Sequence, residues 1–155
     1  MSGEKNNTWS TALLTLVFQN TAAANIGNTG GLQPSTVAGS LYISLHTSDP
    51  GITGNQTSNE VTTGAYASYT RVGIVRSSAQ WTISGSTSAQ VVNINPVTFP
   101  QCTGGTGATL TYFAVGTALT GTGEILYSGP LTSSLAVSNN ITPAFAGSQL
   151  IITED

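Results

Sequence analysis

The sequence of 155 residues carries very little charge: three Lys or Arg, six Asp or Glu, and one His. Charged residues make up 6% of the chain, whereas soluble domains average about 25%. With a net charge of −3 there is no basic surface, which argues against nucleic-acid binding, because Lys and Arg dominate affinity for phosphates. Hydroxyl and amide side chains must hydrate the surface instead, and these cost less to dehydrate than charges. The composition favours a protein that packs against many copies of a partner molecule.

Cysteine and long apolar runs are also scarce. Cys102 is the single cysteine, which excludes a disulfide framework and fits a reducing cytosol, and we expect its side chain to be buried. Residues 1–16 lack the basic region and continuous apolar stretch of a signal peptide. No run approaches the ~18 apolar residues of a membrane span. We therefore expect synthesis in the cytoplasm and no membrane partner.

Groups that could perform catalysis are few and scattered. His46 and Asp49, with one of many serines, could imitate a hydrolytic triad, but no Gly-x-Ser-x-Gly motif is present. Carboxylates for glycoside cleavage would have to come from Glu60, Glu124 or Asp49, all in or near expected loops. One His and one Cys provide no metal-ligand spacing, and no Lys follows the glycine-rich turns to hold a phosphate. The sequence predicts no catalytic residue, no cofactor and no metal.

One amphipathic helix is expected near the start of the chain, over residues 8–18. Asn7 or Thr8 can cap its first amides. Its apolar residues fall at helical spacing and form one stripe: Trp9, Ala12, Leu13, Leu16 and Val17. The stripe packs either on the body of its own domain or on a neighbouring subunit, and the sequence leaves both open.

After the helix, residues 21–39 are rich in Thr, Asn, Gly and Ala and read as a long connecting arm. The period then changes to two over residues 41–46. There Leu41, Ile43 and Leu45 are expected to face a core, and Tyr42, Ser44 and His46 the opposite side. The predicted organisation is a helix and arm over residues 1–39, followed by a β domain over residues 40–155.

Short strand-like runs separated by glycine-rich turns fill the β domain. Besides residues 41–46, the expected strands are 66–76, 80–84, 91–99, 109–115, 124–131, 144–153 and a shorter 135–138. About eight strands after one helix predict an all-β protein, namely an antiparallel jelly-roll-like β-sandwich with one N-terminal α-helix and a long connecting arm. An immunoglobulin-like sandwich remains an alternative.

The two arginines are expected on opposite faces of the run 66–76. In a chain with so few charges, each should have a specific partner. Arg71 and Arg76 could pair within the chain, with a carboxylate such as Asp49 or Glu60 or with backbone carbonyls at a strand end. Alternatively, Arg71 could anchor a subunit interface, where arginine is enriched.

Several strand and turn motifs along the chain match a known pattern. They are residues 41–50 (LYISLHTSDP), 69–72 (YTRV), 97–100 (VTFP), 125–131 (ILYSGPL) and 141–148 (ITPAFAGS). Together with the N-terminal helix, they resemble a family of small structural proteins of tailed bacteriophages. Members are often labelled tail fibre proteins, and some look like capsid decoration or cement proteins with a β-sandwich fold.

The resemblance and the low charge together suggest a non-enzymatic virion protein. The first hypothesis is a capsid decoration protein, a homotrimer on the capsid surface that binds and stabilises the shell of major capsid protein. The alternative is a tail fibre or baseplate adaptor that serves as a host-attachment module. The residues we expect at interfaces are Trp9, Leu13, Leu16, Val17, Tyr42 and Arg71.

Overall fold

The computed structural model describes residues 5–85 and 88–154, and its first element is the helix α1 (Asn7–Gln19). The side chain of Asn6 caps this helix by accepting the Thr8 N–H at 2.9 Å, so the cap precedes the Asn7 or Thr8 expected from the sequence. At the other end, Asn20 adopts a left-handed conformation with φ of 52° and donates its N–H to the Thr15 carbonyl. A predicted helix over residues 8–18 is thereby confirmed.

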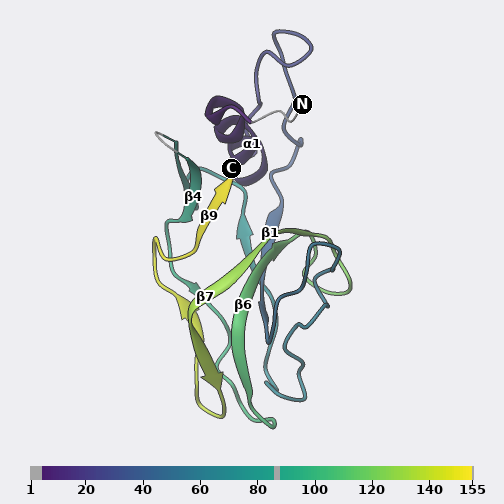
Figure 1. Cartoon of the computed structure of the whole chain (residues 1–155), viewed down its shortest axis with the longest axis vertical. Helices are drawn as coiled ribbons and strands as arrows, with labels where there is room; N and C mark the ends of the chain where they lie inside the picture. Colours follow the sequence, from purple (N-terminus) through teal and green to yellow (C-terminus); the bar gives the residue numbers. More distant parts are fainter. Residues whose placement is uncertain (1–4, 86–87, 155) are drawn as a thin grey trace. The chain divides into compact units, whose positions relative to one another are not determined.

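The chain folds as two compact units, of which the first contains α1. Its described residues are 5–39, 75–85, 88–96 and 146–154. The strands β3 (Trp81–Ser84), β4 (Ala89–Asn93) and β9 (Ile151–Glu154) form an antiparallel sheet in the order β3-β4-β9. The helix packs against all three strands (Figure 1).

The core of the first unit lies between α1 and this sheet. Leu14 and Phe18 of the helix are fully buried, and the Phe18 ring meets Trp81 edge-on with the ring centroids 4.9 Å apart. Gln19 adds a hydrogen bond of 2.8 Å from its amide to the Trp81 carbonyl. The helix therefore packs within its own chain through a row other than the predicted stripe, whose residues are partly exposed.

The second unit comprises residues 40–74 and 97–145. Its main sheet has the order β2-β1-β6-β7 and contains β1 (Ser40–His46), β2 (Val72–Val75, its last residue in the first unit), β6 (Ala108–Gly116) and β7 (Ile125–Val137). β6 pairs antiparallel with both β1 and β7. The short strands β5 (Val97–Thr98) and β8 (Ala144–Phe145) pair antiparallel as a separate ribbon. This ribbon packs on the main sheet through Phe145, whose ring centroid lies 5.8 Å from that of Phe113.

The expected strands are present, but five of the runs differ clearly in extent, and the run 66–76 forms a strand over β2 alone. The runs 91–99 and 144–153 are each split in two, giving β4 with β5 and β8 with β9. In both cases the chain leaves one compact unit and enters the other at the break. The runs 124–131 and 135–138 instead form the single strand β7, whose pairing with β6 shifts in register between Leu110 and Tyr112 and again between Val115 and Gly116.

The fold class is mostly β, with antiparallel sheets and one helix, as predicted. The jelly-roll arrangement is not confirmed. A jelly roll packs eight strands in two sheets, whereas the strands of the described residues form sheets of four, three and two.

The face of β1 opposite Leu41, Ile43 and Leu45 is also covered, which the alternation did not predict. Ser44 and His46 were expected to face away from a core, yet both side chains have 0% exposure. Tyr42 alone of the three is partly exposed. The polar face of β1 is therefore covered by other parts of the second unit, and the groups that cover it define the candidate site.

Candidate functional site

A buried group of polar side chains lies at the end of β1 in the second unit. We call it the polar cluster; its members are Ser44, His46, Gln56, Glu60, Tyr69 and Arg71. They come from β1, from the loop 47–64 and from the segment that precedes β2. Ser44, His46 and Gln56 have no exposed surface, and Arg71 is 5% exposed.

At its centre is a two-point ion pair between Arg71 and Glu60. The Nε and Nη2 atoms of Arg71 donate to the two carboxylate oxygens of Glu60, both at 2.7 Å. The guanidinium also donates to the carbonyls of Ala118 at 2.9 Å and Gly121 at 2.8 Å. All of these partners lie within the second unit, so one of the intramolecular alternatives for Arg71 is confirmed, and its partner is Glu60.

Tyr69 links this ion pair to β1. Its hydroxyl donates to Glu60 Oε1 at 2.7 Å and accepts the Leu45 N–H at 3.1 Å. Burial, followed by the negative charge of Glu60, raises the pKa of Tyr69 well above its usual value. The hydroxyl therefore stays protonated and donates to Glu60 throughout the physiological range.

His46 and Ser44 form a buried hydrogen-bonded pair. His46 Nδ1 lies 2.8 Å from the Ser58 carbonyl, which can only accept, so Nδ1 carries the proton. Nε2 then accepts from the Ser44 hydroxyl at 2.8 Å. This is the serine and histidine half of a hydrolytic triad, but a backbone carbonyl replaces Asp49, and neither side chain is exposed to a substrate.

The buried imidazole should make the fold less stable in mild acid. Burial is the main cause that lowers the pKa of His46 below its usual 6.5. Because the folded state then binds fewer protons than the unfolded state, its stability is complete above pH 6.5 and is lost as the pH falls towards the lowered pKa. We expect the free energy of unfolding, from urea titrations between pH 7.5 and 5, to fall by at most about 1.4 kcal/mol per pH unit.

The single histidine of the chain makes this test clean. In the His46→Gln variant the free energy of unfolding should not vary between pH 7.5 and 5, whatever its absolute value. An imidazole that titrates at pH 6.5 or above in the NMR spectrum of the folded protein would contradict the buried, neutral state.

Gln56 fastens the loop 47–64 to the loop 117–124. Its side-chain oxygen accepts the Ala118 N–H at 2.9 Å, and its backbone N–H donates to the Thr122 carbonyl at 2.8 Å. The side chain lies against Gly116 and Gly123, where an added Cβ would come within 2.2 and 2.0 Å of it. Its Nε2 is buried without a partner among the described residues. The polar cluster thus holds both loops in a fixed conformation on the main sheet.

The expected interface residues do not form one site. Trp9, Leu13, Leu16 and Val17 lie on α1 in the first unit and are partly exposed. The buried stripe of the helix is instead Ser10, Leu14 and Phe18. In the second unit, Tyr42 is partly exposed beside Gly73, whereas Arg71 is held by the contacts described above.

Arg76 has a structural role in the first unit. Its guanidinium donates to the carbonyls of Val17 at 2.6 Å and Leu16 at 2.7 Å, in the last turn of α1. It also donates to the Ala38 carbonyl at 3.1 Å and the Ser35 hydroxyl at 3.0 Å. A cation at this position satisfies free carbonyls and opposes the negative end of the helix dipole. Arg76 therefore fixes both the helix and the arm.

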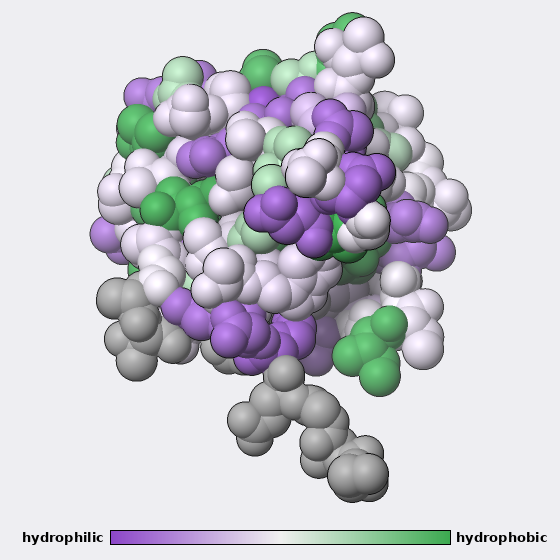
Figure 2. Space-filling model, turned by 90° about the horizontal axis from the view of Figure 1, so that it is seen from above, coloured by the Kyte–Doolittle hydropathy of each residue, from purple (hydrophilic) through white to green (hydrophobic). Residues whose placement is uncertain are grey.

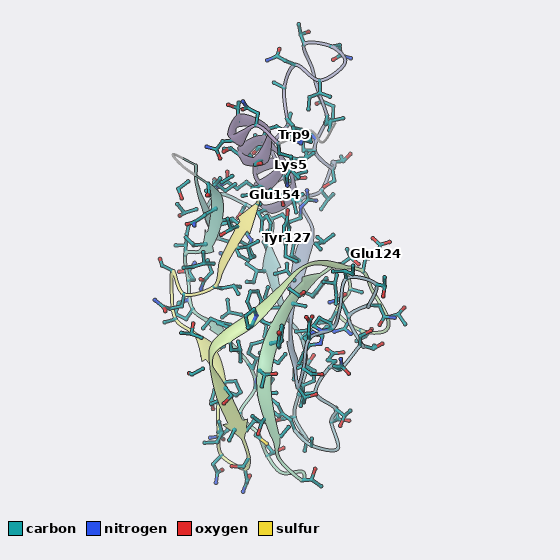
Figure 3. The ribbon with its side chains drawn as sticks, viewed as in Figure 1. Lys5, Trp9, Glu124, Tyr127 and Glu154 are labelled. Carbon is teal, nitrogen blue, oxygen red and sulfur yellow. The ribbon has the colours of Figure 1, made fainter. Side chains whose placement is uncertain are left out.

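A second ion pair among the described residues lies in the first unit. Lys5 and Glu154, which are labelled in Figure 3, form this pair. Cys102 is buried, as expected. Residues 5–85 and 88–154 hold no group of three or more His, Cys, Asp or Glu that could bind a metal ion. No helix in these ranges has the length and apolar character to cross a membrane.

Comparison with protein-family models gives a match over almost the whole chain. The family model described as Podophage GP4 fiber I protein gp80 matches residues 5–153. No curated protein matches the sequence.

Proposed function

The chain belongs to the family of Podophage GP4 fiber I protein gp80, and we propose that it is a non-enzymatic component of a podophage tail fibre. The observation that carries the proposal is the extent of the match, which includes both compact units. The tail-fibre alternative drawn from the sequence fits the description of this family at least as well as capsid decoration does. The family is one of phage virion structural proteins, and the finer assignment to the tail rests on its description.

The closed polar cluster supports a structural rather than a catalytic role. Its one hydroxyl beside an imidazole, Ser44, has no exposed surface. Its one ion pair is occupied by bonds between Arg71, Glu60 and two carbonyls. The side chains that could perform acid–base or nucleophilic chemistry hold the loops in place. A substrate could reach these side chains only if the loops unfolded.

The outer surface supports packing against other proteins. Most of the face in Figure 2 is drawn in pale shades of intermediate hydropathy, with smaller hydrophilic and hydrophobic areas. Such a surface is dehydrated at lower cost than a charged one. This property is expected of a protein that is assembled into a larger particle.

Self-association as a homotrimer is part of the proposal, and β7 supports it. β7 is the outermost strand of its sheet, has thirteen residues and contains no charged side chain. Soluble proteins protect a long edge strand with charges, prolines or bulges, since its free backbone groups can pair with another chain. β7 has Pro130 and two register shifts but no charge, so the stretches on either side of Pro130 remain open to pairing. Sedimentation of the purified chain tests this: a trimer is expected, and a monomer at the concentrations of assembly would contradict it.

Copy number in the virion tests the proposed location. Quantitative mass spectrometry of purified virions should find this chain in a small multiple of the rotational symmetry of the tail. A count comparable to that of the major capsid protein would instead support decoration of the capsid shell and would overturn the proposal.

A further inference from the structure

A tight turn in the loop 47–64 presents one apolar side chain to solvent. Asp49 Oδ1 accepts the Gly51 N–H at 2.8 Å, and the Gly54 N–H donates to the Gly51 carbonyl at 3.1 Å. Asn59 ties the turn to the rest of the loop by donating to the Asp49 carbonyl at 2.8 Å. At its tip, Ile52 has a relative exposure of 106%, the highest among the large hydrophobic residues described.

Three hydrogen bonds and two glycines define the conformation of this turn, at whose tip Ile52 is exposed. An added Cβ at Gly54 would lie 1.9 Å from the Pro50 carbonyl oxygen, which leaves room for glycine alone. Gly51 adopts a φ of +76°, which favours glycine. A preorganised loop loses little entropy when it binds.

A second exposed apolar side chain lies on the adjoining loop. Leu119, 47% exposed, belongs to the loop 117–124, which pairs with the first loop where Asn55 meets Glu124. Ile52 is three residues from Asn55, and a chain spans at most about 3.6 Å per residue, so the turn stays within about 11 Å of that junction. We call the exposed surface of these two loops the loop face.

The loop face carries negative charge alone. Asp49 and Glu124 are exposed, and residues 47–64 and 117–124 contain no Lys or Arg. The nearby Arg71 is buried and paired with Glu60. The complementary surface is therefore an apolar pocket with cationic side chains at its rim.

Protein fits this face better than carbohydrate does. Sugar rings pack on aromatic side chains, and neither loop contains Phe, Tyr or Trp. An exposed apolar side chain can instead fill a pocket on a protein partner, and a few such buried side chains supply most of the affinity of a protein interface.

We propose that the loop face docks this chain onto another protein of the virion, with Ile52 inserted into an apolar pocket that Lys or Arg side chains surround. The inference rests on the proposed function in one respect, because it takes the partner to be a virion protein. It does not depend on whether that partner belongs to the tail or to the capsid.

Incorporation into virions tests the docking. A phage that lacks the gene is grown in cells that supply the wild-type chain, the I52D variant or the V37D variant, and copies per virion are measured by mass spectrometry. Val37 is 79% exposed and lies on the arm of the first unit, so it is a matched control. We expect I52D to lower incorporation by at least about tenfold, and V37D to leave it unchanged.

Two further measurements keep the outcome unambiguous. The melting temperature of purified I52D should equal that of the wild type, because the side chain contacts solvent alone. Glu124→Lys should also lower incorporation, since it places a cation against the expected cationic rim. Incorporation of I52D at the wild-type level would overturn the proposal. If such virions also failed to adsorb to cells, the loop face would bind the host surface instead of a virion protein.

Discussion

Replacing Arg71 by methionine should lower the free energy of unfolding by about 3–5 kcal/mol, because it leaves one partner of a buried ion pair without its counter-charge. Glu60 would keep its carboxylate with the Tyr69 hydroxyl as its remaining side-chain donor. The carbonyls of Ala118 and Gly121 would lose their donors as well. Urea unfolding of the purified variant measures the loss.

Two comparison variants separate the pair from the packing around it. Arg71→Lys keeps the charge but cannot make the two-point bond to Glu60, and its loss should be intermediate. Adding Glu60→Leu to Arg71→Met removes the unpaired carboxylate and should recover part of the stability. A loss below about 1 kcal/mol for Arg71→Met would show that the polar cluster does not hold the two loops.

Replacing Trp81 by alanine should cost about 3–5 kcal/mol, the usual range for removal of a large aromatic side chain from a core. Trp81 has 0% exposure and is among the largest buried side chains of the chain. It contacts Phe18, so its loss would leave a cavity between α1 and the sheet of the first unit. Thermal and urea unfolding followed by circular dichroism measure the effect.

Trp81→Phe is the matched control for this substitution. The indole Nε1 is buried without a hydrogen-bond partner among the described residues, so removing its N–H also removes a desolvated donor. We expect Trp81→Phe to cost clearly less than Trp81→Ala, because an aromatic ring stays in place and the cavity is smaller. Equal losses for the two variants would contradict the proposed packing of α1 on Trp81.

The hydrophobic periodicity predicted the positions of the strands better than it predicted which of their side chains are buried. The alternation over residues 41–46 located β1 correctly and placed Ser44 and His46 on the face opposite Leu41, Ile43 and Leu45, but it did not indicate that this face is buried as well. Their burial depends on Ser58 and on the loop that brings it to His46. A period of two identifies two faces, and the partners that bury the polar one are remote in the sequence.

The helix shows a similar limit. Residues 7–19 contain no charged side chain, so apolar groups occur on several faces and the pattern does not single out the buried one. The row chosen from the sequence included Trp9 and Leu13, whereas the buried row consists of Ser10, Leu14 and Phe18. Contact with Trp81 in a distant strand decides between them.

The polar cluster could be predicted in part. The scarcity of charge indicated that Arg71 has a specific partner, and Glu60 was one of the two carboxylates considered. Gln56 was not identified, because it lies in a polar stretch where nothing in the sequence distinguishes it from its neighbours Asn55 and Thr57. Its importance comes from the space that Gly116 and Gly123 leave for it after folding.

The location of the chain on the particle tests the proposed function most directly. An antibody against the purified protein, coupled to gold, can be applied to intact virions and observed by electron microscopy. We predict gold at the tail and none on the capsid, and virions that lack the gene provide the control for specific labelling. Gold distributed over the capsid surface would contradict a tail-fibre role.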